Sequence, residues 1–92
     1  MIDTESLKKG QEEGIIWRGW QIKHHQYGPS SLVLKLPLIE VVINENMGKR
    51  GILDLFINNK LVNRDKDELP MIEYAQAFIR QEYAKIREWS GE

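Results

Sequence analysis

Residues 52–89 decide the fold, and they read ILDLFINNKLVNRDKDELPMIEYAQAFIRQEYAKIREW. Apolar residues occupy every second position from Leu53 to Ile57, which is the pattern of a strand with one buried face. Asn58 and Asn59 follow, and asparagine is the residue that best tolerates positive φ after glycine, as a two-residue hairpin turn requires. The stretch therefore predicts a β-hairpin whose short return strand follows the turn directly.

A long amphipathic helix is predicted after this hairpin. The return strand covers residues 60–63, and Pro70 fits the first turn of a helix because its missing N–H has no helical partner there. Placed ~100° apart, the apolar residues from this proline to Trp89 gather on one side of the helix. They are Met71, Ile72, Ala75, Phe78, Ile79, Tyr83, Ile86 and Trp89. The helix thus has one face to bury, and a sheet is the surface available to bury it.

The residues before position 52 predict more sheet and one short helix. Residues 3–12 carry acidic residues early and lysines late, an order that suits the dipole of a helix. Residues 15–26 alternate well enough for a strand. Between Leu32 and Ile43 the alternation is strong but slips by one position at Pro37, which predicts either one bent strand or two short strands.

Together these patterns predict an α+β fold. It has a mainly antiparallel sheet of about four to five short strands, one long C-terminal helix packed on one face and a short N-terminal helix. The length of 92 residues predicts a single domain, residues 1–92, with one core. The predicted core residues are Trp20, Ile22, Leu34, Leu36, Val41, Leu53, Leu55, Ile57, Ile72, Ala75, Ile79 and Ile86.

Composition and charge exclude several classes of protein. No apolar run approaches the ~20 residues that span a bilayer, so a membrane protein is excluded. The 13 Lys and Arg residues nearly balance the 14 Asp and Glu residues, and a net charge of -1 disfavours a broad nucleic-acid-binding surface. Because the sequence has no cysteine and no secretory signal, we expect a cytoplasmic protein without disulfides or thiolate metal sites.

The sequence also argues against catalysis. It contains no Gly-x-Ser-x-Gly motif, no phosphate-binding glycine loop and no pair of carboxylates placed by a motif. His24 and His25 are adjacent, and adjacent residues of a strand point to opposite faces, so they cannot chelate one ion. We therefore expect no enzyme: no catalytic residues, no metal site and no cofactor.

The second face of the sheet is the candidate contact surface. If the alternating leucines face the helix, six apolar residues face the other way, and a face left to water should be more polar than that. These residues are Ile15, Trp17, Val33, Val42, Ile52 and Phe56, and all of them except Ile15 are predicted partner-binding residues. Either the N-terminal helix covers part of this face, or another protein or a second copy of the chain does. A surface with scattered apolar residues and no specific role is the alternative.

Trp17 is the expected anchor of such an interface, because tryptophan is enriched at the energetic centres of interfaces. Together with Arg18 and Lys23 it also forms an aromatic and basic pattern of the kind found in single-strand binders. However, Trp17 and Trp20 cannot share one stacking platform on a strand, and a near-neutral chain neutralises few phosphates. A nucleic-acid-binding domain is therefore the alternative hypothesis.

Glu82 is a charged residue inside the apolar side of the predicted C-terminal helix. A buried carboxylate without a partner would be costly. It should therefore pair with Lys85 or reach solvent, or else it receives an arginine from a partner protein or a second subunit. If it receives such an arginine, Glu82 is one of the predicted partner-binding residues.

As a whole, the sequence predicts a small non-enzymatic protein-interaction module, such as an adaptor, an inhibitor or an accessory subunit. It would bind through the sheet face around Trp17 or through exposed hairpin loops. A compact, cysteine-free sheet with one helix also occurs among small phage and mobile-element proteins that block host enzymes. Besides the nucleic-acid-binding domain, the alternative is a structural homo-oligomer, for example a homodimer.

Overall fold

A computed structural model describes residues 3–26, 28–46 and 48–89, with the backbone alone for 86–89. Within these residues the elements are helix α1 (Thr4–Glu12), strands β1 (Gln21–Lys23), β2 (Ser31–Lys35), β3 (Glu40–Glu45), β4 (Leu53–Ile57) and β5 (Lys60–Asp65), and helix α2 (Glu68–Trp89). The described strands form one antiparallel sheet in the order β1-β2-β3-β4-β5. The predicted α+β fold is confirmed.

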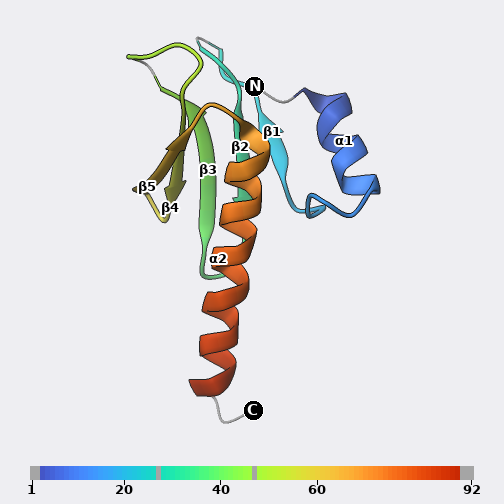
Figure 1. Ribbon diagram of the computed structural model, residues 1–92, viewed down its shortest axis with the longest axis vertical. Coiled ribbons are helices and arrows are strands. Elements are labelled where there is room, and N and C mark those ends of the chain that lie inside the picture. The colour runs from blue at the N-terminus through green and yellow to red at the C-terminus, as the bar shows by residue number, and fades with distance from the viewer. Residues whose placement is uncertain (1–2, 27, 47, 90–92) are drawn as a thin grey trace.

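Helix α2 crosses one face of the sheet, which we call the inner face, and continues past the ends of the strands (Figure 1). Its main contacts with the sheet are with β3, β4 and β5. Because residues of a strand alternate between the two faces, the register brings Leu34, Val41 and Ile57 side by side on the inner face. We call the opposite side of the sheet the outer face.

The core lies between the inner face and α2. The predicted core residues that are buried are Trp20, Leu34, Val41, Leu53, Leu55, Ile57, Ile72, Ala75 and Ile79. Ile22 and Leu36 are only partly buried against this core, and the side chain of Ile86 lies outside the described residues. The core also contains residues beyond the predicted set, namely Leu7, Ile16, Leu32, Ile39, Ile43 and Met71.

The predicted two-residue turn joins β4 to β5. Asn58 and Asn59 have φ angles of 51° and 68°, both in the left-handed region that this kind of hairpin turn needs. Asn58 also bonds to the neighbouring strand, because its Oδ1 accepts a hydrogen bond from the backbone N–H of Glu40 at 2.9 Å. Beyond the turn, β5 extends to Asp65 rather than ending at Asn63 as predicted.

A bulge interrupts the pairing of β4 with β5. Leu55 lies opposite Asn63, whereas the next residue, Phe56, lies opposite Leu61, so Val62 has no partner in the ladder. Such an extra residue bends the strand and increases its twist. The bulge thus lies on β5, an edge strand of the sheet.

The slip of the apolar pattern at Pro37 marks a hairpin turn, so the alternative of two short strands is the one realised. The backbone N–H of Leu36 donates to the carbonyl of Ile39 at 2.9 Å and closes the turn between β2 and β3. Because the chain reverses direction there, Leu34 and Val41 face each other in register although the apolar phase changes between them.

Residues 15–20 do not form the predicted strand, and of the range 15–26 only β1 is a strand. The reason is Gln76 of α2, which takes backbone groups that a ladder would use. Its Oε1 accepts from the N–H of Trp17 at 2.9 Å, and its Nε2 donates to the carbonyl of Ile15 at 3.2 Å. Gly19 allows the close approach to β2, since a Cβ there would lie 2.8 Å from Leu34 Cδ1.

Helix α1 joins the core on the inner face instead of covering the outer face. Asp3 caps it: the backbone N–H of Ser6 donates to Asp3 Oδ1 at 2.7 Å, which lowers the pKa of that carboxyl. Leu7 is buried in the core, and Gln11 Nε2 donates to the carbonyls of Trp17 and Trp20. The C-terminal half of α1 is thereby fixed to the segment that leads into β1.

Helix α2 begins at Glu68 rather than at Pro70. In the part of the chain that the structure describes, no helix is both long enough and apolar enough to cross a membrane. The described residues form one small α+β domain.

Candidate interface on the outer face of the sheet

An apolar row crosses the outer face at its centre. The register aligns Val33 of β2 with Val42 of β3, and Val42 with Phe56 of β4. Leu61 continues the row on β5 opposite Phe56, and Gln21 ends it on β1 opposite Val33. The three central side chains are partly exposed and Leu61 is 45% exposed. We call Val33, Val42, Phe56 and Leu61 the apolar row.

A polar row runs beside it. Lys23 lies opposite Ser31 in the register, and Asn44 lies opposite Asp54, which in turn lies opposite Arg64. The Ser31 hydroxyl donates to Asn44 Oδ1 and so joins the two halves of the row. The row thus brings together side chains of all the described strands on the outer face.

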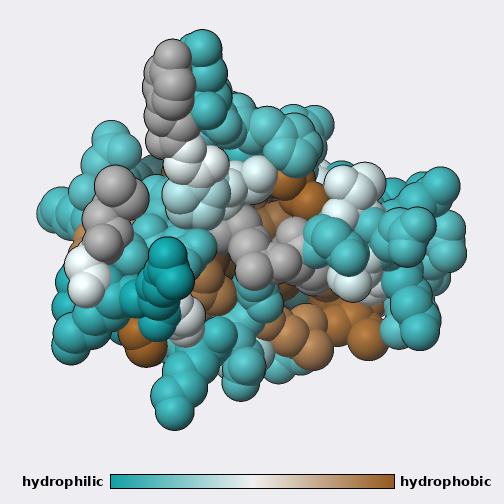
Figure 2. All heavy atoms as spheres, turned by 90° about the horizontal axis from the view of Figure 1, so that it is seen from above, coloured by the Kyte–Doolittle hydropathy of each residue, from teal (hydrophilic) through white to brown (hydrophobic). Residues whose placement is uncertain are grey.

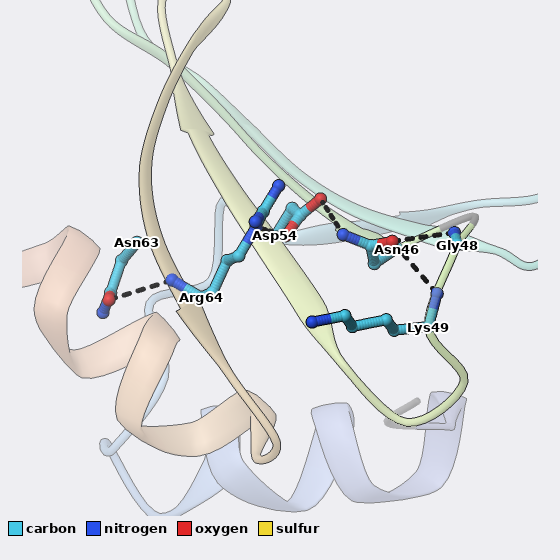
Figure 3. A network of polar contacts seen from close by, with 6 residues as sticks. All are labelled: Asn46, Gly48, Lys49, Asp54, Asn63 and Arg64. Atoms are coloured by element: carbon cyan, nitrogen blue, oxygen red, sulfur yellow. Dashed lines mark hydrogen bonds and ion pairs between the residues drawn. The ribbon is translucent and has the colours of Figure 1, made fainter.

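At one end of the polar row, the carboxylate of Asp54 is satisfied within the chain. Arg64 and Asn46 approach it from opposite sides (Figure 3). Arg64 Nε lies 2.8 Å from Asp54 Oδ1, and Asn46 Nδ2 donates to Oδ2 at 3.1 Å. Asp54 is buried to 8% exposure, so these two donors offset the cost of burying its charge. This end of the row therefore needs no external partner.

The β3–β4 loop closes on the same carboxylate. Asn46 Oδ1 accepts hydrogen bonds from the backbone N–H groups of Gly48 and Lys49 (Figure 3). Ile52 completes the loop, because its carbonyl accepts from the N–H of Asn46 at 2.8 Å and its N–H donates to Lys49. The predicted contact residue Ile52 thus belongs to the loop and precedes strand β4.

At the other end of the polar row, the outer face of β1, β2 and β3 is hollowed. The hollow has a volume of about 490 Å³ and is lined by polar and charged residues together with Ile22, Val33 and Val42. In it, the Lys35 ammonium lies 3.8 Å from the Glu40 carboxylate. Lys23 is exposed and has no ion-pair partner among the described residues. Within the described residues, one cation of the hollow is therefore unpaired.

A histidine completes this hollow. His25 Nε2 lies 2.8 Å from Ser31 Oγ. His24 turns elsewhere, with its Nδ1 3.0 Å from Ser30 Oγ. Among the described residues, no group of three or more metal-ligating side chains could hold an ion.

The structure brings together Val33, Val42 and Phe56 of the predicted contact residues, but not the other three. Trp17 lies in the irregular segment before β1, where the guanidinium carbon of Arg80 is 5.5 Å from the centre of its ring. This corrects its placement on the second sheet face, and the reason is the hydrogen bond of its backbone to α2. Glu82 pairs with Lys85 at 3.3 Å on the same helix, which is the first of the alternatives predicted for it from the sequence.

The same placement separates the residues of the nucleic-acid pattern. Trp17 packs beside α2, whereas Lys23 lines the hollow on the outer face. The two side chains therefore do not form one aromatic and basic surface. The grouping of polar side chains in the hollow, such as His25 and Asn44, could not be predicted from the sequence. Only the register of three strands brings these side chains together.

The end of the molecule that carries the β3–β4 loop is mainly hydrophilic. Figure 2 shows hydrophilic residues over most of this end, with hydrophobic side chains visible between them and along one side. In the β3–β4 loop, the described residues from Gly48 to Gly51 are all exposed.

No protein-family model, curated protein or solved structure matches this chain. The case for a function therefore rests on the geometry of the two sheet faces.

Proposed function

We propose that this chain is a non-enzymatic protein-interaction module that binds another protein through the outer face of its sheet. One observation carries the proposal. Helices α1 and α2 both contribute to the core on the inner face, which leaves the outer face without a covering helix within the described residues. A sheet face turned to water is normally polar, yet the centre of this one is the apolar row.

The arrangement of the face suits a protein partner. Interfaces have an apolar centre and a polar rim, and here the apolar row is flanked by the polar row and by the Lys35–Glu40 pair. Phe56 supplies the aromatic side chain that such centres favour. The hairpin loops are the weaker candidate, because the β3–β4 loop exposes mainly polar residues. An adaptor, an inhibitor and an accessory subunit would all bind in this way.

A pair of glutamine variants tests this proposal. Val42→Gln places a polar side chain at the centre of the apolar row, and Ala77→Gln introduces the same side chain at an exposed position of α2. Because the sequence has no cysteine and suits a reducing compartment, the tagged proteins are used to capture partners from a cytoplasmic extract. Bound proteins are then quantified by mass spectrometry, and thermal unfolding checks that both variants fold.

We expect at least one protein that wild type and Ala77→Gln retain equally and that Val42→Gln retains about tenfold less, a loss of roughly 1.4 kcal/mol in binding. Light scattering at several concentrations tests whether the partner is a second copy of this chain. A wild-type dimer that Val42→Gln dissociates would make this chain its own partner on the same face. If folded Val42→Gln binds and assembles as Ala77→Gln does, the proposal is wrong.

A further inference from the structure

We infer that the hollow on the outer face takes an extended acidic segment of the partner protein, with Lys23 as the cation that meets a carboxylate of that segment. This inference rests on the proposed function and specifies the chemistry of the partner.

The charge of the hollow favours a carboxylate. Its charged lining residues are Lys23, Lys35 and Glu40, that is two cations and one anion, so the site carries +1 on a chain whose net charge is -1. Glu40 lies near Lys35, and Arg64 of the polar row pairs with Asp54, so that Lys23 is the cation of the hollow without an ion-pair partner among the described residues. A single carboxylate would balance this charge.

The same charges disfavour nucleic acid. A polynucleotide places a phosphate at every nucleotide, and binding it takes several cations along the groove. Glu40 would repel those phosphates, since its side chain is 44% exposed within the hollow. No phenyl or indole ring is among the residues that line the hollow, so it offers no large aromatic surface on which bases could stack.

Hydrogen-bonding groups in the hollow suit a peptide backbone. The side-chain amide of Gln21 has no hydrogen-bond partner among the described residues. Asn44 is held through Oδ1 by the Ser31 hydroxyl, which leaves its Nδ2 as a donor. An amide group can both donate and accept, as the N–H and C=O groups of a peptide require.

The spacing of the rows matches an extended chain. Gln21 lies opposite Val33 at the end of the apolar row, and Lys23 lies opposite Ser31 at a distance of two residues along both strands. Two strand residues span roughly 6.6 Å, which is also the distance between side chains i and i+2 of an extended peptide. A peptide lying along the strands would therefore place an apolar side chain on Val33 and Val42 and an acidic one, two positions away, at Lys23.

An NMR titration of the full chain with a designed peptide tests this inference. The probe is acetyl-Ser-Val-Ser-Glu-Ser-Val-Ser-amide, and the matched peptides replace Glu by Lys or both Val by Ser. Lys23→Glu is compared with Lys66→Glu, which makes the same charge change at an exposed site in the connection before α2. Lys23→Gln serves as the second variant if Lys23→Glu does not fold.

We expect amide shifts confined to β1, β2 and β3, an affinity about tenfold lower for Lys23→Glu, and less than about a twofold change for Lys66→Glu. Both matched peptides should bind more weakly than the probe. Four outcomes would each overturn the inference: no shifts at millimolar peptide, equal losses in the two lysine variants, equal binding of the Lys peptide, and displacement of the probe by oligodeoxythymidine.

This test fails separately from that of the proposed function. A captured protein that is lost with Val42→Gln but retained with folded Lys23→Glu keeps the outer face as the interface. The same result removes the acidic segment as its occupant.

Discussion

A Gln76→Leu variant should lose about 2 to 6 kcal/mol of unfolding free energy, because two donors then lack their acceptor and each costs about 1 to 3 kcal/mol when buried. Gln76 is 5% exposed, and its Oε1 accepts from the N–H of Trp17 and, at 3.1 Å, from Nε1 of Trp20. Leucine has a similar size but no acceptor. Urea unfolding followed by tryptophan fluorescence measures the loss.

Gln81→Leu is the matched control, since it makes the same replacement at an exposed position of the same helix. It should change the free energy of unfolding by less than about 0.5 kcal/mol. Equal stability of the two variants would mean that Gln76 does not hold residues 15–20 against α2. A domain of this size has only about 5 to 15 kcal/mol in total, so the expected loss is large.

Truncating Ile79 to alanine should cost about 2 to 5 kcal/mol, the usual loss for a buried isoleucine whose site cannot collapse. Ile79 is 2% exposed in the core between α2 and the sheet. For a domain of this length the change lowers the melting temperature by at least about 8 °C. Differential scanning calorimetry gives both quantities.

Leu38→Ala is the control for this truncation. Leu38 is 65% exposed in the β2–β3 turn, so its removal should shift the free energy of unfolding by less than about 0.5 kcal/mol. A soluble Ile79→Ala protein that melts with wild type would show that the wrong face of α2 has been assigned to the core.

The fold from residue 52 onward could be predicted because its signals are local. The alternation of β4, the positive φ of Asn58 and Asn59, and the helical spacing of apolar residues in α2 each depend on neighbours within a few positions. For the same reason Val33, Val42 and Phe56 were assignable to one face once the strands were recognised.

Residues 15–20 could not be predicted in this way. Their conformation depends on Gln76, which lies far away in the sequence, and the backbone bonds to it displace a strand pattern that the side chains alone favour. Trp17 was misplaced for that reason. The hollow was out of reach as well, because Lys23, His25 and Asn44 meet only through the register of three strands.

The bulge at Val62 bears on how this protein can assemble. β5 is an edge of the sheet, and a regular edge invites a strand of another molecule to continue the ladder. The unpaired residue bends this edge, and the other described edge, β1, spans only Gln21–Lys23. Addition of strands from other molecules, and with it growth into open-ended fibres, is therefore hindered at both margins.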